Sequence, residues 1–488
     1  MSFSHALSQE VNIARILHVE RPGHTSMPDA RMAIGTPPQR SAAGTVTMTT
    51  RPASRMAEQS RIESCPPRQR LLFITPVTPA ETGNGLAMRA GLFLEALGQA
   101  YDTTLLVVPT SGPAPRVWSE FITARTTSRL AVCLDDAYGS PDTGEPAAPR
   151  DVAALRARLQ PALSRFATAP VLEQVRGLVG DAVFDVVVVA RLYLSPVLNA
   201  LPALLASRPR LILDLDDDEV RTREQMGALH ERRGELALAR VEQMEAEKYR
   251  VLESEWVHRF DAVIVCAEAD RSIVTARTGH RHVHVVPNGV RTATHPFATS
   301  HGSADQARLL FVGSLSYFPN VDAAAMLCRE VRPRLQDRLA RPVRVDLVGA
   351  RPTAPVFELQ ALEGVAVHAN VADLAPFYRC AHAAVVPIRA GGGTRIKLLE
   401  AFAFGTPVVS TSIGANGLDV VAGRHLLIAD EPAAIVDQCA QLVTDPSHGA
   451  RLAGAARQLV EERYEAMTIA VAIRALVNNQ PSRPPRFH

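Results

Sequence analysis

Short apolar runs recur along this chain of 488 residues in two series, and in each series helical stretches separate the runs. The first series comprises residues 71–75, 103–108, 186–190, 211–214 and 262–266, and the second comprises residues 309–313, 343–348, 383–387, 407–410 and 426–429. Strands buried on both faces of a sheet are continuously apolar, and the helices that connect parallel strands cover both faces. The alternation therefore predicts doubly wound parallel sheets, with ligands at the carboxyl ends of the strands.

The polar segment 295–306 separates the two series and predicts a domain boundary. A single hydrophobic core stops growing at roughly 250–300 residues, so a chain of this length divides into domains. We expect an α/β protein with two tandem Rossmann-like domains facing a central cleft. The expected parts are a disordered tail, two Rossmann-like domains, and a crossover helix with a tail, over residues 1–69, 70–290, 305–455 and 456–488.

The composition is that of an ordinary globular protein, with 47% hydrophobic and 21% charged residues and a formal net charge of +2. This balance gives no signature of nucleic-acid binding. Six cysteines lie far apart without metal-type spacing, which predicts a reducing compartment and no zinc site. The N-terminus lacks an apolar stretch before a cleavage site, so we expect a cytoplasmic protein. The charged segment 220–259 predicts one or two solvated helices.

A glycine-rich loop leads into a predicted helix at Gly391-Gly392-Gly393-Thr394-Arg395-Ile396-Lys397-Leu398-Leu399-Glu400. Glycines let the backbone approach a ligand closely, and the start of a helix presents free N–H groups to an anion such as a diphosphate. Lysine and arginine together number 52, yet the only lysines are Lys248 and Lys397. Ammonium and guanidinium groups are not interchangeable, so Lys397 indicates a local geometric requirement. The alternative is that Arg395, Lys397 and Glu400 are surface charges on an amphipathic helix.

Together with the segments 311–315, 348–349, 287–289 and 412–418, this loop and helix resemble the retaining glycosyltransferases of family 4, which have the GT-B fold. The resemblance extends over residues 70–475, and an exopolysaccharide sugar-transferase subgroup with a Gly-Gly-Thr-Arg-x-Lys sequence is the most similar. It implies that Glu400 is the second glutamate of a Glu-x7-Glu motif and holds the ribose. The first glutamate, which contacts the donor sugar, falls on Gly392, so the chain departs from the motif there.

The resemblance also implies that residues 70–290 are the acceptor-side domain and residues 305–455 the nucleotide-sugar-binding domain, with a donor site that draws on both. In the C-terminal domain it includes Gly391, Gly392, Gly393 and Thr394, and it extends to Gly313, Ser314 and Asn320 after the first strand of the second series. The family commonly has basic residues in that second loop, which this chain lacks, so Arg395 and Lys397 become the candidate catalytic residues. Gly83 and Gly85 precede a predicted helix and are expected near the sugar and diphosphate; the alternative is an ordinary turn before a helix.

The candidate acceptor-side residues follow strands of the first series. Arg191 and Tyr193 come directly after residues 186–190, although an arginine there can also be satisfied by nearby acids. Asp214 and Asp216 are expected to serve acceptor binding or structure. Their Asp-x-Asp spacing resembles the metal site of the other large glycosyltransferase fold, but two tandem Rossmann-like domains argue against that fold, and we expect neither a metal site nor a cofactor.

The expected activity is transfer of a sugar, with retention, from a nucleoside-diphosphate sugar to a glycan or lipid-linked acceptor. The expected setting is polysaccharide or glycolipid synthesis in the cytoplasm, with peripheral contact at the inner face of the membrane and no nucleic-acid partner. Two alternatives remain open: a nucleotide-sugar epimerase of the same fold, and a non-catalytic nucleotide-sugar-binding protein, which the glycine at position 392 motivates. The donor base, the sugar, the acceptor and the linkage are not fixed by the sequence.

Overall fold

The computed structural model describes residues 68–110, 114–133, 160–164, 168–295, 297, 305–393 and 395–478. The predicted tail, residues 1–69, lies outside these residues except for Arg68 and Gln69, which precede the first strand. The expectation for Thr394 likewise falls on a residue that is not described.

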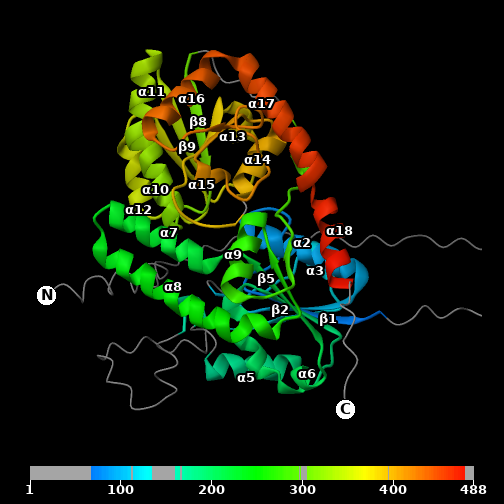
Figure 1. Cartoon of the computed structure of the whole chain (residues 1–488). Coiled ribbons are helices and arrows are strands. Elements are labelled where there is room, and N and C mark those ends of the chain that lie inside the picture. The colour runs from blue at the N-terminus through cyan, green and yellow to red at the C-terminus, as the bar shows by residue number, and fades with distance from the viewer. Residues whose placement is uncertain are drawn as a thin grey trace, which may run out of the picture. The chain divides into compact units, whose positions relative to one another are not determined.

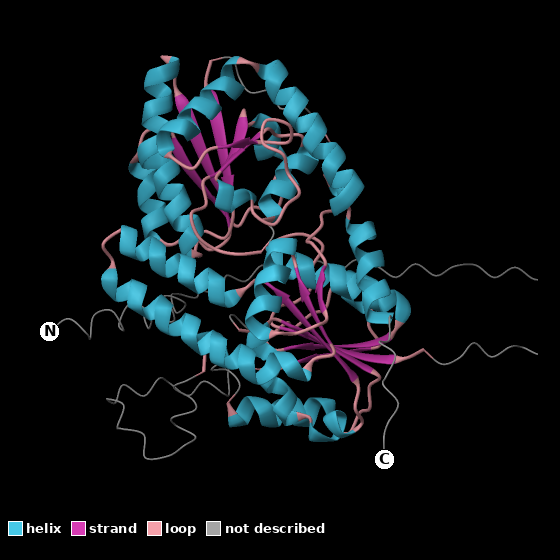
Figure 2. Cartoon of the chain, in the orientation of Figure 1, coloured by secondary structure: helices cyan, strands magenta, loops and turns pink. Residues whose placement is uncertain are grey.

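The first domain is built on a parallel sheet of seven strands in the order β3-β2-β1-β4-β5-β6-β7. The strands are β1 (Arg70–Thr75), β2 (Asp102–Val107), β3 (Ser128–Ala131), β4 (Val186–Ala190), β5 (Arg210–Asp216), β6 (Ala262–Val265) and β7 (Val283–Val285). All five residues of the valine-rich β4 are buried, and β4 pairs with β1 in the register Leu71↔Val186. Figure 2 shows this sheet with helices on both sides.

Alternate residues of the central strands belong to different hydrophobic cores. In β1, Leu72 and Ile74 pack in one core cluster, whereas Leu71 and Phe73 pack in another. Because successive side chains of a strand point to opposite faces, the sheet is covered on both faces. The covering helices are α2 (Gly85–Ala100), α3 (Glu120–Thr123), α5 (Ala169–Val179), α6 (Pro202–Ala206), α7 (Glu219–Arg232), α8 (Leu236–Trp256) and α9 (Glu268–Thr278).

The second domain contains a parallel sheet of six strands in the order β10-β9-β8-β11-β12-β13. Its strands are β8 (Ala307–Val312), β9 (Val343–Gly349), β10 (Val365–Ala369), β11 (Ala383–Val386), β12 (Val408–Ser410) and β13 (Leu427–Ile428). The strand order reverses between β8 and β11, which is where doubly wound sheets bind ligands. The two parallel sheets confirm the predicted α/β class with two Rossmann-like domains.

Helices also flank the second sheet (Figure 1). They are α10 (Phe318–Met326), α11 (Arg332–Leu339), α12 (Ala354–Glu358), α13 (Ala375–Cys380), α14 (Ile396–Phe404), α15 (Ser412–Ala415), α16 (Pro432–Thr444) and α17 (Pro446–Leu459). Helix α14 follows the glycine-rich loop and ends at Gly405, which is in the left-handed conformation with φ 81°.

The C-terminal segment is not one continuous helix. After α17 and a short π-helical turn, Glu465 is extended, with φ −66° and ψ 131°, and α18 (Ala466–Asn478) follows. Buried side chains of α18, among them Ile473, belong to a core cluster of the first domain. Figure 1 shows α18, in red, beside α2. The extended residue redirects the chain from the second domain to the first.

The charged segment 220–259 forms two helices, α7 and α8, and the expectation that they are solvated is wrong, because each of them buries one face. Met226 and Leu229 of α7 are buried against Ala390 in the loop after β11. The imidazole of His230 stacks on the ring of Phe318, with centroids 4.0 Å apart. A helix of the first domain thus packs on the loop that precedes α14, and its high charge is accommodated on its other faces.

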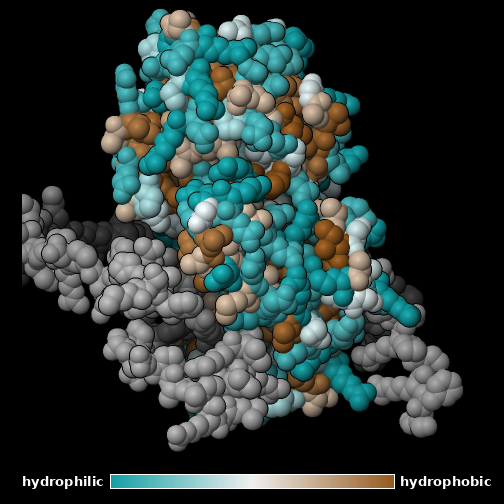
Figure 3. Space-filling model, turned by 60° about the vertical axis from the view of Figure 1, so that its left-hand side comes forward, coloured by the Kyte–Doolittle hydropathy of each residue, from teal (hydrophilic) through white to brown (hydrophobic). Residues whose placement is uncertain are grey.

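On the described part of the face in Figure 3, hydrophobic residues lie singly or in small groups among hydrophilic ones. None of the helices among the described residues combines the length and apolar character needed to cross a membrane.

Candidate functional site

The loop between β11 and α14 turns sharply because two of its glycines are left-handed. Gly391 has φ 110° and Gly393 has φ 69°, backbone conformations that residues with a Cβ rarely adopt. Arg395 precedes the first helical residue, and its Nη1 donates a hydrogen bond to the carbonyl oxygen of Gly392. The start of α14 therefore lies within a compact, cationic loop.

Lys397 points from the first turn of α14 toward the loop after β8. Its Nζ donates to Oδ1 of Asn320 at 2.7 Å, and Nδ2 of Asn320 donates to the carbonyl oxygen of Ser314 at 2.8 Å. A Cβ on Gly313 would lie only 2.8 Å from the Lys397 Nζ, so glycine leaves room for the ammonium group. The structure thus brings Gly313, Ser314, Asn320 and Lys397 together where the strand order reverses.

Glu400 lies one helical turn beyond Lys397 and is 6% exposed. Burial raises the pKa of Glu400 to about 7, against the opposing effects of Lys397 and of a hydrogen bond with Tyr378. Burial also lowers the pKa of Lys397 to about 7, helped by Arg395 and opposed by Glu400. Both groups therefore titrate near neutrality, and an anion beside Lys397 will favour its charged form.

The glycines of the first domain differ in their relation to this loop. A Cβ on Gly85 would lie 3.3 Å from Cδ1 of Ile396, so the start of α2 is close to the start of α14. Gly83 has φ 114°, and among the described residues no heavy atom beyond its chain neighbours lies within 4 Å of its Cβ position. Gly83 is thus required by its backbone conformation and not by crowding.

Asp214 forms a buried ion pair that sequence analysis did not foresee. Arg89 of α2 donates from Nε and Nη2 to the two carboxylate oxygens of Asp214 at 2.8 Å and 2.6 Å, and both side chains are 2% exposed. The pair fastens α2 to the end of β5. Tyr193 is also buried, and its carbonyl oxygen accepts a hydrogen bond from the Ser164 hydroxyl. These positions leave Asp214 and Tyr193 little surface for a ligand.

Arg191 and Asp216 are joined by an ion pair of 2.9 Å. Arg191 also pairs with Glu219, and Asp216 accepts a hydrogen bond from the Asn288 amide. Both Arg191 and Asp216 have positive φ values, 76° and 58°. The loops after β4 and β5 are therefore held by one another through charged side chains.

One residue of α7 and one residue just before it contact the glycine-rich loop directly, and neither is a candidate from the sequence. Oε1 of Gln225 accepts a hydrogen bond from the Gly391 backbone N–H at 2.9 Å. Asp217 Oδ1 lies only 1.9 Å from the position that a Cβ on Gly392 would occupy. Asp217 belongs to the acidic run at the end of β5, and this run is the only feature of the sequence that draws attention to the residue.

An ion-pair cluster adjoins the same loop. Asp322 of α10 accepts hydrogen bonds from Arg389 at 2.6 Å and 2.9 Å, and from Arg233, at the end of α7, at 2.9 Å. The side chain of Asp322 is fully buried. This carboxylate therefore joins α7 of the first domain to two elements of the second.

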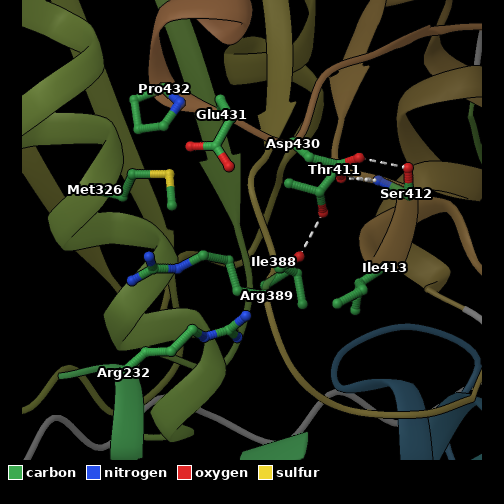
Figure 4. Close-up of a pocket in the computed structure, with 10 residues that line it drawn as sticks. All are labelled: Arg232, Met326, Ile388, Arg389, Thr411, Ser412, Ile413, Asp430, Glu431 and Pro432. Carbon is green, nitrogen blue, oxygen red and sulfur yellow. Dashed lines mark hydrogen bonds between the residues drawn. The ribbon is translucent and has the colours of Figure 1, made fainter. Parts of the chain in front are cut away.

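A cavity of about 440 Å³ lies at the carboxyl ends of β11, β12 and β13 (Figure 4). Its walls include Arg389, Ser412 and Asp430, with Arg232 of α7. Asp430 accepts hydrogen bonds from the backbone N–H and the hydroxyl of Ser412, at 2.7 Å and 2.8 Å. None of the predicted donor residues lines this cavity. The candidate site is therefore the group formed by Gly313, Ser314, Asn320 and Lys397, called here the Lys397 cluster.

Across the described ranges, no group of three or more His, Cys, Asp or Glu side chains is placed to hold a metal ion. The five described cysteines, at positions 133, 266, 328, 380 and 439, are free thiols.

Comparisons with known proteins place this geometry in a fold class. Residues 306–445 match the family model described as glycosyl transferases group 1. Glycogen synthase from Mycobacterium tuberculosis (strain H37Rv) is 28% identical over 240 residues, which are 46% of this chain and 56% of the relative. The chain thus spans about half the length of the curated relatives it matches.

Solved structures resemble the chain over most of its length. Sucrose-phosphate synthase from Thermosynechococcus elongatus has a TM-score of 0.59 at 15% identity, over 84% of this chain and 98% of that one. HepE from Anabaena in complex with UDP and glucose has a TM-score of 0.54 at 14% identity, over 85% and 100%. A TarM variant from S. aureus, in complex with Fondaparinux, alpha-GlcNAc-glycerol and UDP, has a TM-score of 0.58 at 11% identity, over 84% and 100%. The fold is GT-B, as predicted; the exopolysaccharide subgroup remains a prediction.

Proposed function

We propose that the protein is a glycosyltransferase that uses a nucleoside-diphosphate sugar as donor. The observation that carries this proposal is the Lys397 cluster: a partly buried ammonium group, held by Asn320, at the strand-order reversal of the second sheet. The family match over residues 306–445 covers this region and supports the same activity. Complexes of two similar structures with UDP support a nucleotide ligand.

In this proposal the diphosphate lies against the loop 391–393 and the start of α14. Free backbone N–H groups at a helix start stabilise an anion, and Arg395 and Lys397 add two positive charges. Negative charge develops on the diphosphate as the bond to the sugar breaks. These cations therefore stabilise the transition state more than the ground state. They also supply the neutralising charge that a metal would otherwise provide, so we propose that no metal is essential.

Glu400 is the proposed ligand of the ribose. A carboxylate accepts hydrogen bonds from both hydroxyls of a ribose, and Glu400 follows Lys397 by three residues on α14. Binding converts the largely buried carboxyl group to its ionised form by giving it hydrogen-bond donors.

We further propose that the acceptor is a glycan or a lipid-linked sugar and that configuration is retained. The TarM complex contains a glycan and a glycosyl glycerol, which supports an acceptor of this chemistry. Arg191 and Asp216, on the first domain, are the proposed acceptor-side residues with remaining exposure; their side chains are 12% and 14% exposed. The proposed setting is polysaccharide or glycolipid synthesis in the cytoplasm, in contact with the membrane surface.

The test is a thermal-shift screen with UDP-glucose, UDP-N-acetylglucosamine, GDP-mannose, ADP-glucose and dTDP-glucose, each beside its parent diphosphate and each with and without EDTA. A ligand at about 100 times its Kd stabilises the folded state by about 2.7 kcal/mol, so one base should raise the melting temperature clearly. The shift should survive EDTA. If none of these nucleotides shifts the melting temperature, the proposed function is wrong.

A second candidate function is binding of a nucleotide sugar without turnover. It is favoured by Gly392, which stands where the motif has its first glutamate. Incubation of the preferred sugar nucleotide with a panel of glycan acceptors separates the two functions, because only a transferase forms a glycosylated product. The same incubation without acceptor tests the epimerase alternative, whose product is an epimerised sugar nucleotide.

A further inference from the structure

Asp217 occupies the space that a side chain at position 392 would fill. It lies between β5 and α7, and its Oδ1 is 1.9 Å and its Cγ 3.1 Å from the Cβ position of Gly392. The same carboxylate lies beside Gly393, whose Cβ position is 3.8 Å from the Asp217 Cβ. Glycine at position 392 is therefore required for this carboxylate to reach the loop.

Asp217 differs from its acidic neighbours because no cation among the described residues pairs with it within 4.0 Å. Asp214, Asp216 and Asp218 each form an ion pair with an arginine. Asp217 forms none within the part of the chain that the structure describes, and the Thr222 hydroxyl donates to its Oδ1 at 2.9 Å. The carboxylate is thus oriented by one hydroxyl group and retains capacity to accept further hydrogen bonds.

The surroundings of Asp217 hold it near the point of ionisation. Burial raises the pKa of Asp217 to about 7, with Glu219 and Asp216 acting in the same direction and the guanidinium groups of Arg191 and Arg395 opposing them. A carboxyl group in such a position is readily stabilised by new hydrogen-bond donors. A carboxylate that has one hydroxyl partner and no ion pair within 4.0 Å among the described residues can accept further hydrogen bonds from a ligand.

A purely structural role, in which Asp217 links the first domain to the glycine-rich loop, does not explain this carboxylate. No hydrogen bond between Asp217 and the loop is formed among the described residues, and the contact with Gly392 is steric. Gln225 already supplies the hydrogen bond from α7 to Gly391, and Asp322 supplies the ionic link to α10. The contacts that hold these elements together are made by other side chains.

Resting on the proposed function, we propose that Asp217 binds hydroxyl groups of the donor sugar, so that the first domain supplies a carboxylate that the glycine loop lacks. The loop 391–393 and Arg395 are the proposed binding place of the diphosphate, and the sugar is bonded to that diphosphate. A carboxylate seated against Gly392 and Gly393 is therefore placed beside the sugar and not beside the base or ribose. Asp217 is thus a donor-specificity residue carried by the opposite domain.

The test compares Asp217→Asn with the wild type. Asparagine keeps the size of the side chain and can still accept the Thr222 hydrogen bond, so the fold should persist, which a melting curve verifies. Calorimetry is done with the sugar nucleotide that gives the largest thermal shift and with its parent diphosphate. We expect about a 10- to 100-fold loss of affinity for the sugar nucleotide, the effect of losing a hydrogen bond to a charged group, and less than a twofold change for the diphosphate. Glu224→Gln, an exposed carboxylate on α7, is the matched control and should change neither.

A second variant moves the carboxylate between domains. The double substitution Asp217→Ala with Gly392→Asp should recover at least fivefold of the affinity lost in Asp217→Ala, because an aspartate at position 392 places its oxygens in the volume that Asp217 now fills. A double variant no better than Asp217→Ala contradicts the proposal. So does an Asp217→Asn protein that binds the sugar nucleotide within twofold of the wild type, or that loses diphosphate and sugar-nucleotide affinity equally. Failure of the wild type to bind any diphosphate is a different result, since that overturns the proposed function itself.

Discussion

The Nζ atom of Lys397 lies 2.7 Å from Oδ1 of Asn320 and 4.6 Å from the centre of the Phe311 ring. No carboxylate oxygen of the described residues lies within 4.0 Å of it, whereas Lys248, the other lysine, pairs with Glu245 at 2.6 Å. A partly buried ammonium group held by a neutral amide and an aromatic face is oriented but not neutralised. This relationship is the reason that Lys397 is the proposed anion-binding group.

Replacing Lys397 with methionine should abolish most nucleotide binding and leave the fold intact. Methionine fills a similar volume without the cost of a buried charge, so the free energy of unfolding should stay within about 1 kcal/mol of the wild type. Loss of a charge-assisted contact should weaken diphosphate affinity by at least about tenfold and lower kcat/KM by about a hundredfold. Calorimetry and a transfer assay measure these effects. The control is Lys248→Met, and equal losses in the two variants would contradict the assignment.

When the protein binds a nucleoside diphosphate, the complex should take up protons above neutral pH and release protons below it. At pH 8 Lys397, with a pKa of about 7, is mostly neutral, and an anion beside it raises that pKa, so a proton is bound. At pH 6 Glu400, also with a pKa of about 7, is mostly protonated, and ribose hydroxyls that favour the carboxylate release a proton. Calorimetric titrations in two buffers of different ionisation enthalpy measure this exchange. A proton change of the same sign at both pH values would refute the paired roles.

Glu400→Gln should raise the free energy of unfolding, compared with the wild type, more at pH 8 than at pH 5. The pKa of Glu400 is about 7 in the folded state and 4.5 in the reference state. Between these values the folded state binds more protons than the unfolded state, so the free energy of unfolding falls as pH rises. Glutamine removes that loss, on the order of 2 kcal/mol. Denaturant unfolding of both proteins at pH 5 and pH 8 tests this, and a parallel pH dependence of the two proteins would contradict it.

Asp322→Asn should destabilise the contact between α7 and the second domain. The fully buried carboxylate of Asp322 is shared by Arg233 and Arg389, and its loss leaves both guanidinium groups without their common partner. Because the two arginines are partly exposed, we expect a cost of about 1–3 kcal/mol in unfolding experiments. Asp437→Asn breaks an exposed pair with Arg338 and should cost less than about 0.5 kcal/mol. Equal costs for the two substitutions would argue against a structural role for Asp322.

Ile473→Ala in α18 should destabilise the protein by about 2–4 kcal/mol, because Ile473 is fully buried in the first domain. Val471→Ala, on the exposed side of the same helix, should change stability by less than about 0.5 kcal/mol. Thermal unfolding distinguishes them, and indistinguishable variants would show that α18 does not contribute to that core.

The central strands could be predicted from the sequence because they are continuously apolar, as in the valine run of β4. Strands β3, β7 and β10 lie at sheet edges and were not predicted. They are short and only partly buried, and a half-solvated edge strand lacks the apolar run that reveals a central one.

The loop and α14 were predicted from glycine spacing and charge, which are local signals. Asp217 and Gln225 were not, since their role depends on contact with residues more than 150 positions away along the chain. The pairing of Arg89 with Asp214 was hidden for the same reason, because nothing in helix α2 itself marks Arg89 as buried. Contacts between distant segments follow from the packing of whole elements, which local patterns do not encode.

The chain passes between its two domains twice, and the two passes are tied to one another. The backbone N–H of Val290 donates to the carbonyl oxygen of Tyr464 at 2.9 Å, and the N–H of Ala466 donates to the carbonyl oxygen of Val290 at 3.0 Å. Two linkers fastened at one place act as a single pivot. Any relative movement of the two domains that preserves these hydrogen bonds is therefore a rotation about residues 290 and 465.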